Sequence, residues 1–457
     1  MFDHNNFSTG IISVPIVVGI LALAVTSVFK WLGKAGYKYP PGPKGIPFFG
    51  NFFQLSRKGF QEWGHKYAAV DLFDRRSGIY SDRPNWVVLN SLTHGLLLGA
   101  VNYGELWRKM RRGGHQFLNK TATTQYYQLQ ELEALILSEH LLKDSTNWQQ
   151  EVFRSSISML RSTVYDVPPT VSVHDPVIES FNKFDSLVME ATVPGNYLVE
   201  FFGYMKFLPS VLAPWKAKMT KGFKEASVFF ERLCEDVEKQ INEGDEKLSI
   251  AGFAIREQER LGLSKSEVAW LPATLANGSA SLAEALLWFF LAMVAFPEEQ
   301  KRCQEEIDSV VGRSRMPSFE DSESLPYLRA TVREVLRWRP ISPLGTQHVT
   351  RQGDDAEEFR PARFLDKEGK FVPIAGDTKD AYLESEGHVA YGFGPRLLWT
   401  ATVSPVMDKQ TGNPILPDLK NTDGAGITVR PPAFEMEVNH RFSEAAALFS
   451  QTKELLG

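Results

Sequence analysis

The feature that most constrains the fold is an uncharged stretch near the N-terminus. Residues 10–29 contain no Asp, Glu, Lys or Arg, and about twenty such residues suffice for a helix to cross a bilayer. Lysines follow at positions 30, 34, 38 and 44, whereas Asp3 and His4 are the only ionisable side chains before the stretch. Because Lys and Arg collect on the cytosolic side of membrane helices, we expect an anchor with residues 1–9 in the lumen. A buried core helix is the alternative interpretation.

The segments on either side of this stretch extend the same interpretation. Asn6 begins the sequon Asn-Phe-Ser, which is a candidate glycosylation site on the lumenal side. Residues 30–45 contain the run YPPGPKG, and successive prolines form a stiff, extended hinge because they cannot continue a helix. We therefore expect a single-pass membrane protein whose main domain, residues 46–457, lies in the cytosol.

The composition of the whole chain limits the class of protein. Hydrophobic residues make up 43% of the 457 residues, which supports a large core and argues against disorder. A net charge of −5 does not indicate nucleic-acid binding. Cys234 and Cys303 are the two cysteines, and two cysteines form neither a disulfide framework nor a zinc motif. Both lie in charged, helix-like surroundings typical of surface helices, and we expect unreactive thiols.

A glycine-spaced motif stands near the C-terminus. Residues 387–399 read GHVAYGFGPRLLW, with Tyr391, Gly392, Gly394 and Arg396 in close succession. Glycine has no Cβ and tolerates positive φ, so such a turn brings backbone close to a flat or anionic group. The motif therefore predicts one wall of a ligand site.

A second motif predicts a buried charge network. Residues 325–340 (LPYLRATVREVLRWRP) have apolar residues at helical spacing and end at a proline. Glu334 and Arg337 are three residues apart on this helix and share a face. Arg363 lies in the later run FRPARF. A buried triad of such charges is tolerated only when every member is paired.

These motifs, in this order, resemble the cytochrome P450 family. The resemblance implies a mainly α fold with small β-sheets, a haem b cofactor and a monooxygenase supplied with electrons by NADPH-cytochrome P450 reductase. Tyr391, Gly392, Gly394 and Arg396 match the haem-binding loop. Leu398 stands where the family has the cysteine that ligates iron, so no metal ligand is predicted in this chain.

The resemblance also assigns residues to the haem propionates. Trp107 and Arg111, four residues apart, match a helical pair of the family that hydrogen-bonds a propionate. The same residues suit an amphipathic basic helix with a core tryptophan. His348 matches a further propionate contact, although a lone histidine is more often packed or solvated.

A long apolar helix is expected to be central. Ser264 and Glu267 form a capping-box pattern, and the helix that they begin is expected to run to Phe296. In the family this helix crosses the haem and carries an acid and a hydroxyl. Here Ser281 is the candidate distal hydroxyl, whereas Ala280 replaces the acid. Small residues that pack in mid-helix are the alternative explanation.

Residues 201–215, an apolar stretch broken by prolines, have two interpretations. In membrane-anchored relatives such a stretch covers the substrate channel and dips into the bilayer. A buried corner between helix and loop has the same composition.

We expect segments to be missing at three places, near residues 68–78, 350–356 and 396–397. Well-preserved flanks indicate lost exons or an error in the assembled gene. We expect the ligand cysteine to belong between Arg396 and Leu397, so that the chain as it stands has no monooxygenase activity.

The sequence as a whole resembles fungal microsomal members of this family. Such members lie in the endoplasmic reticulum and oxidise small apolar compounds in secondary metabolism or xenobiotic oxidation. A non-catalytic, membrane-anchored protein that binds an apolar ligand or a partner is the alternative.

Overall fold

A computed structural model describes residue 83 and residues 86–118, 123–193, 195–245, 249–342, 359–370, 388–423 and 428–456. All of them belong to one unit, Ala69–Gly457. The predicted lumenal tail with Asn6, the anchor, the hinge and His348 lie outside the described residues.

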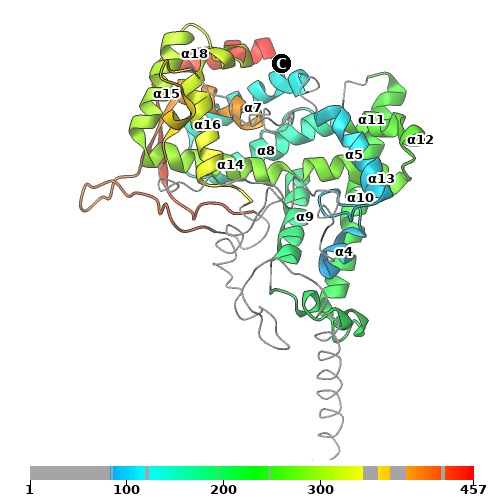
Figure 1. Cartoon of the computed structure of the whole chain (residues 1–457). Helices are drawn as coiled ribbons and strands as arrows, with labels where there is room; N and C mark the ends of the chain where they lie inside the picture. Colours follow the sequence, from blue (N-terminus) through cyan, green and yellow to red (C-terminus); the bar gives the residue numbers. More distant parts are fainter. Residues whose placement is uncertain are drawn as a thin grey trace, which may run out of the picture. The chain divides into compact units, whose positions relative to one another are not determined.

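The described chain is mainly helical, as predicted (Figure 1). Its α-helices are α4 (Val87–Thr93), α5 (Glu105–Leu118), α7 (Tyr127–Lys143), α8 (Trp148–Tyr165), α9 (Pro176–Thr192), α10 (Pro214–Glu243), α11 (Ile250–Arg256), α12 (Gln258–Leu261), α13 (Lys265–Ala276), α14 (Ser279–Ala295), α15 (Pro297–Val310), α16 (Pro326–Trp338), α17 (His388–Thr400) and α18 (Ala445–Leu456). Short 3-10 turns are η4 (Thr124–Tyr126), η5 (Leu198–Glu200), η6 (Gly203–Phe207), η7 (Phe319–Ser324) and η8 (Pro361–Phe364).

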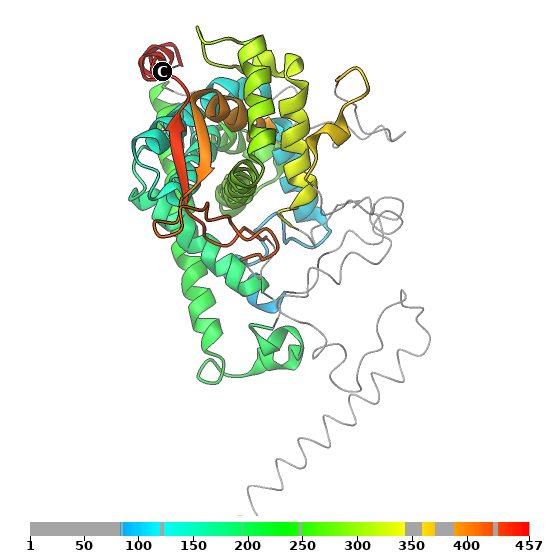
Figure 2. The same cartoon turned by 90° about the vertical axis from the view of Figure 1, so that its left-hand side faces the viewer.

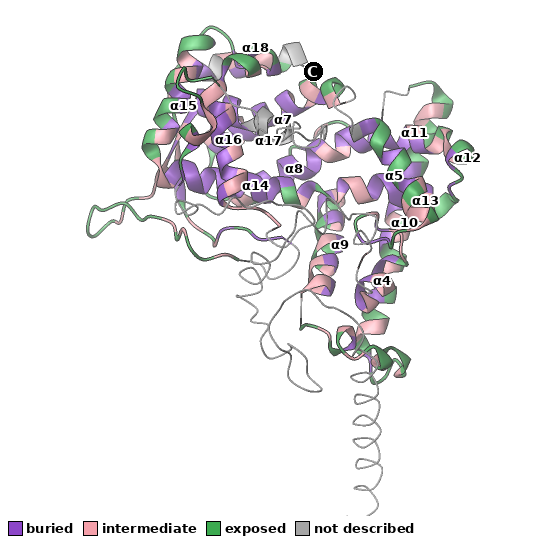
Figure 3. Cartoon of the chain, viewed as in Figure 1, coloured by how far each residue is buried: buried purple, intermediate pink, exposed green. Residues whose placement is uncertain are grey.

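Helix α14 lies at the centre of one hydrophobic core. Its residues Leu282 to Val294 are buried without interruption, and Figure 3 shows neighbouring α8 and α7 buried along much of their length. Such a helix, apolar on every side, has to be surrounded by other elements. Helices α7, α8, α16 and α17 supply the surrounding apolar side chains. The indole of Trp288 donates to the carbonyl of Val429 at 3.1 Å, so its polar atom is satisfied within the core.

The predicted long helix from Ser264 to Phe296 is two helices. Its capping box is confirmed, because Ser264 accepts from the backbone of Glu267 and the Glu267 side chain accepts from Ser264. The helix then breaks at Asn277 and Gly278, where Gly278 N bonds Leu275 O in a tighter turn. A glycine without side-chain packing weakens a helix at this point. By length and composition the stretch Lys265–Ala295 could cross a membrane, but 78% of its apolar window is buried inside the protein.

A second core packs against α10, which is 30 residues long. Aromatic rings from three helices meet there: Phe184 of α9, Phe230 of α10 and Trp270 of α13 lie with ring centroids 5.1 to 5.7 Å apart. In edge-to-face geometry at these distances, the positive edge of one aromatic ring attracts the negative face of the next ring. Gly222 of α10 allows α4 and α9 to approach closely.

The strands β1 (Ala401–Pro405) and β2 (Met436–His440) form an antiparallel pair, drawn side by side in orange and red in Figure 2. The other edge of β1 is covered by glutamine side chains of α15. The amide of Gln300 donates to Val403 O and accepts from Val403 N, both at 2.9 Å, and Gln304 donates to Ala401 O at 3.0 Å. Two side chains thus replace part of a neighbouring strand.

Candidate functional site

The predicted glycine-spaced turn is instead part of helix α17. The helix runs from His388 through Gly392 and Gly394 to Thr400, so the prediction of a loop at this place is wrong. An added Cβ at Gly394 would contact the ring of Phe289 at 3.7 Å, which shows that α17 lies directly against α14. Side chains 394–400 are all buried, and this packing favours a continuous helix despite the two glycines. The side chain of Tyr391 is not described.

Arg396 faces a partner inside the protein. Its guanidinium lies 2.8 Å from the carboxylate of Glu131 on α7 and donates to the Glu131 carbonyl at 3.1 Å. The residue is 3% exposed. Burial lowers its pKa, and the charge of Glu131 opposes this effect. Arg396 therefore links α17 to α7 through a buried ion pair.

Leu398 stands at the position of the expected iron ligand and is fully buried in α17. Its neighbour Trp399 donates to Gly312 O at 2.7 Å, and Arg441 donates to the carbonyls of Leu398 and Trp399 at 3.2 Å. The bonds from Arg441 satisfy carbonyls at the end of the helix, where backbone carbonyls lack intrahelical partners. The segment is a well-packed helix end.

The two cysteines lie on the inner faces of their helices. The sequence predicts surface helices around both cysteines, and α10 and α15 do carry charged faces. The cysteines themselves are buried, however, since Cys234 is 8% and Cys303 0% exposed. Burial raises the pKa of each thiol to about 12. The sulfur of Cys303 also lies 3.2 Å from the hydroxyl of Thr331. Neither sulfur is available as a thiolate at neutral pH.

Trp107 and Arg111 lie together on α5. The guanidinium of Arg111 sits 5.6 Å from the ring centre of Trp107, within cation–π distance. Tyr103 extends the cluster, its ring 5.2 Å from that of Trp107. Trp107 is half-buried and Arg111 exposed. The two donors share one face, and their role toward a propionate stays a prediction.

The residues of the expected charge triad meet at Glu334. Its carboxylate is fully buried and accepts from Arg337 at 2.7 and 2.9 Å and from Arg363 at 3.1 Å. The backbone N–H of Arg360 donates to the same carboxylate at 2.7 Å. The network joins α16 to η8, so it fixes a helix to a distant turn.

Ser281 is exposed at the start of α14. One turn later, Glu284 is 6% exposed and accepts from the hydroxyl of Thr428 at 2.9 Å. Burial raises the pKa of Glu284 to about 7, and the nearby charge of Asp185 acts in the same direction. Sequence reasoning missed this buried acid, because its hydrogen-bond partner Thr428 lies 144 positions away and nothing in the pattern of α14 points to it.

An exposed apolar segment follows α9, comprising residues 198–212 with η5 and η6 (the apolar segment). Its large exposed side chains are Leu198 (49%), Phe201 (38%), Tyr204 (52%), Phe207 (79%), Val211 (91%) and Leu212 (67%). The structure does not bury this stretch as a corner between helices. Several large exposed apolar side chains in one segment are typical of a site that contacts another molecule or a membrane.

Comparison with known proteins decides the family. The family model described as cytochrome P450 matches residues 64–355, and cytochrome P450 monooxygenase iboC of Amanita muscaria is 37% identical, with 92% of this chain and 94% of that protein covered. The chain belongs to the cytochrome P450 family. A further P450 monooxygenase, ARMGADRAFT_1018420 of Armillaria gallica, is 35% identical, with 97% of both chains covered.

Solved structures agree with this P450 fold. A zebra fish cytochrome P450, solved with progesterone, superposes with a TM-score of 0.63 over 82% of this chain and 92% of that one, at 20% identity. At this identity the likeness concerns the fold alone. The mainly α architecture predicted from the sequence is confirmed.

The P450 family uses haem, an organic substrate and a reductase that delivers electrons. The described residues do not fit axial ligation by a thiolate. Leu398 has no lone pair, and both cysteines of the chain are buried and protonated on α10 and α15. Trp107 and Arg111 suit a carboxylate, but they cannot replace an iron ligand.

Proposed function

We propose that the complete gene product is a haem-thiolate monooxygenase that oxidises a small apolar organic substrate with O2. NADPH-cytochrome P450 reductase would supply the electrons, and secondary metabolism or xenobiotic oxidation is the proposed setting. The chain as it stands lacks the segment with the iron ligand, which belongs between Arg396 and Leu397, and has no monooxygenase activity.

The length of the alignment with iboC carries this proposal. The alignment extends over 528 residues, which exceeds the 457 residues of this chain by 71. The relative therefore has residues without a counterpart here, although 92% of this chain is aligned. Loss of whole segments accounts for both numbers, whereas a substituted ligand alone would leave the lengths equal. Further losses near residues 68–78 and 350–356 are part of the same proposal.

Sequencing of the transcript tests the missing segment directly. We expect the messenger RNA to contain codons for a cysteine-bearing segment between those of Arg396 and Leu397. A full-length transcript that joins these two codons would contradict the proposal.

Spectroscopy separates the enzyme from the non-catalytic alternative. The chain as it stands, expressed with added haem precursor, should give no band of thiolate-ligated haem in the reduced CO difference spectrum. The chain with the segment restored should give that band. If the restored chain also lacks it while folding normally, the alternative of a ligand- or partner-binding protein is favoured.

A second part of the proposal concerns location. We infer that residues 10–29 anchor the protein in the endoplasmic reticulum with the main domain cytosolic, and that the apolar segment faces the same membrane. The exposure of Phe207, Val211 and Leu212 supports this orientation. Protease added to intact microsomes should digest the main domain, and alkaline carbonate should leave the protein in the membrane. Release by carbonate would overturn the anchor.

A further inference from the structure

The hydroxyl of Thr428 joins two helices that each carry a carboxyl group. It donates to Glu284 of α14 at 2.9 Å and lies 3.8 Å from the sulfur of Met189 on α9. Asp185 stands four residues before Met189 and therefore shares its face of α9. The charge of Asp185 also raises the pKa of Glu284, as expected of two carboxylates that lie near each other. The two acids thus belong to one site between α9 and α14.

Among the described residues, no cation pairs directly with either acid of this site. Oε2 of Glu284 is buried and has no hydrogen-bond partner there. Arg430, whose charge lowers the pKa of Glu284, is bound to Asp423 at 2.9 Å and is largely exposed. Burial raises the pKa of Asp185 to about 6 without an opposing positive charge. The site therefore holds negative charge that its own side chains do not neutralise.

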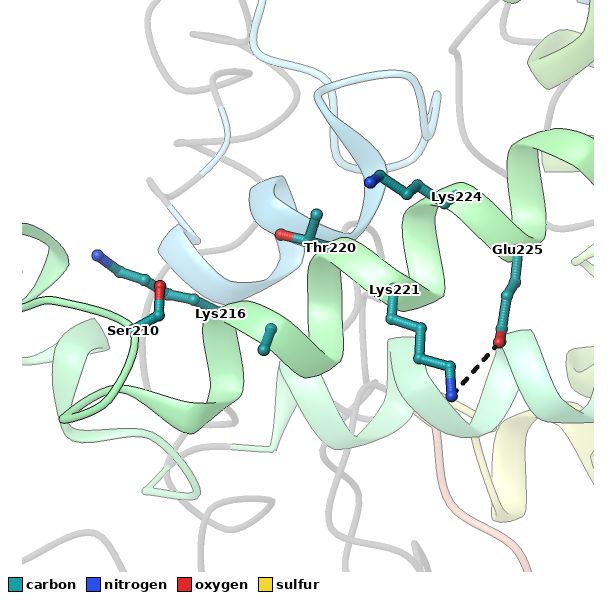
Figure 4. A pocket seen from close by; sticks show the side chains of 7 residues that line it. Ser210, Lys216, Thr220, Lys221, Lys224 and Glu225 are labelled. Atoms are coloured by element: carbon teal, nitrogen blue, oxygen red, sulfur yellow. Dashed lines mark ion pairs between the residues drawn. The ribbon is translucent and has the colours of Figure 1, made fainter.

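The lysine next to this site on α9 is directed to another helix. Lys183, two residues from Asp185, binds Glu225 of α10 at 2.8 Å. Glu225 also pairs with Lys221 at 3.8 Å, which Figure 4 shows as a dashed line. Because residues two apart on a helix do not face the same way, Lys183 serves α10 and leaves Asp185 unpaired.

An organic ammonium ion matches this site better than a metal ion. A buried carboxylate is costly unless it is paired with a charge and hydrogen-bonded, and an ammonium group supplies a positive charge and three N–H donors. Groups of three or more metal-ligating His, Cys, Asp or Glu side chains are absent from the described residues. The thioether of Met189 gives the site an apolar wall, which suits the carbon atoms next to an ammonium.

We propose that Glu284 and Asp185 bind the ammonium group of the substrate, an organic amine whose remaining part is apolar. Asp185 is half-buried and Glu284 is 6% exposed, so the ammonium passes Asp185 and binds at Oε2 of Glu284. Ser281, the candidate distal hydroxyl, precedes Glu284 by about one turn of α14. An amine held at Glu284 is thereby brought close to the predicted reaction site. The inference rests on the proposed monooxygenase function and narrows its substrate class.

Thermal unfolding of the full chain tests this site without haem chemistry. The chain as it stands is titrated in neutral detergent with 2-phenylethylamine, an ammonium joined to an apolar ring, and separately with 2-phenylethanol, its neutral counterpart. A ligand that binds only the folded protein raises the melting temperature, and the shift at each concentration reports its Kd. We expect a clear shift with the amine and a much smaller one with the alcohol. Equal shifts with both probes would overturn the ammonium site.

The pH dependence of this binding is a second measurement. Burial raises the pKa of Glu284 to about 7 and that of Asp185 to about 6. Both acids are therefore mainly protonated at about pH 5 and mainly ionised at about pH 8, whereas the amine stays charged at both. We expect the amine to bind more tightly at about pH 8. Equal or tighter binding at the lower pH would contradict the proposal.

Substitutions show which carboxyl groups hold the amine. Glu284→Gln can still accept from Thr428 but removes the charge, so it should raise the Kd of the amine about tenfold or more. Asp185→Asn should weaken binding in the same way. Glu179→Gln is the matched control, because Glu179 is an exposed carboxylate on α9. Equal losses with Glu284→Gln and Glu179→Gln would show a general effect of surface charge and would overturn the site.

The failure of this inference differs from the failure of the proposed function. If the amine does not bind while the chain with its segment restored gives the band of thiolate-ligated haem, the amine site is overturned and the monooxygenase function stands. If the amine binds as expected while the restored chain gives no such band, the ammonium site stands and its assignment to a monooxygenase substrate falls.

Discussion

Glu334 joins three positively charged or polar neighbours within the protein, since Arg337, Arg363 and the backbone of Arg360 all donate to it. Replacing it by glutamine removes the buried negative charge that both guanidinium groups bond. Loss of one partner of a buried ion pair costs about 3–5 kcal/mol. We expect Glu334→Gln to lower the free energy of unfolding in denaturant by about that amount.

Glu323 provides the control for this prediction. It pairs with Arg329 at 2.9 Å, but its side chain is 83% exposed. Exposed pairs contribute about 1 kcal/mol or less, so Glu323→Gln should have a small effect. Similar losses in both variants would contradict the structural role of the buried network.

Glu284 should make stability depend on pH. Burial raises its pKa to about 7, and Asp185, Thr428 and Arg430 are the groups that face it. A carboxyl with a raised folded pKa binds its proton more tightly when folded, so stability is highest below its ordinary pKa and falls as pH rises toward 7. We expect Glu284→Gln to remove about 3 kcal/mol of this fall, measured by denaturant unfolding at about pH 5 and pH 8.

Glu133 is a second buried carboxyl that contributes to the pH dependence of both the wild type and the Glu284→Gln variant. Its pKa is also raised to about 7 by burial, and it is present in both proteins. The pH dependence that remains in the variant therefore belongs to other groups. An unchanged slope between wild type and Glu284→Gln would show that Glu284 titrates like an exposed carboxyl.

Sequence reasoning succeeded where residues close in the chain share a role. The three-residue spacing of Glu334 and Arg337 places them on one helical face, as the structure shows. It failed for Glu284, whose partner Thr428 comes from a distant segment. It also placed both cysteines on surface helices, because the charged neighbours of Cys303 hide the fact that its own face is the inner one.

At the scale of helices, Gly222 sets the distance between α10 and its neighbours. An added Cβ would lie 2.8 Å from methyl groups of both Leu92 and Leu187. Alanine favours a helix over glycine by about 1 kcal/mol, but overpacking costs about 1–3 kcal/mol. We expect Gly222→Ala to lower the melting temperature.

Gly114 of α5 is the matched control. No described atom lies within 4 Å of an added Cβ there, so Gly114→Ala should gain helix propensity and raise the melting temperature. If both variants are stabilised, α10 has room that the structure does not show.

The helices also show why local motifs misled the sequence prediction. Glycines at 392 and 394 favour a turn locally, yet α17 is helical because its last residues pack against α14 and α7. The apolar run after Ser264 predicted one helix, whereas the structure breaks it at Gly278. Tertiary packing decided the first case and a backbone preference the second.

At the scale of the whole molecule, a missing segment and a replaced ligand predict different results. Leu398 is fully buried within α17, so a cysteine at this place would replace a packed side chain in a helix. We expect Leu398→Cys to give no band of thiolate-ligated haem in the reduced CO difference spectrum, whereas the restored segment gives it. A band with Leu398→Cys would show that the ligand was substituted and not removed.

The glutamines of α15 take the place of a third strand beside β1. Gln300 and Gln304 bond the backbone of Val403 and Ala401, and all four residues are buried. Leucines at both positions would keep the volume and keep this edge covered, but buried backbone groups would lose their partners, at about 1–3 kcal/mol for each group. Replacing both glutamines by leucine should therefore lower the free energy of unfolding in denaturant without causing association between molecules. The sheet ends in side chains and offers no strand edge that another chain could extend.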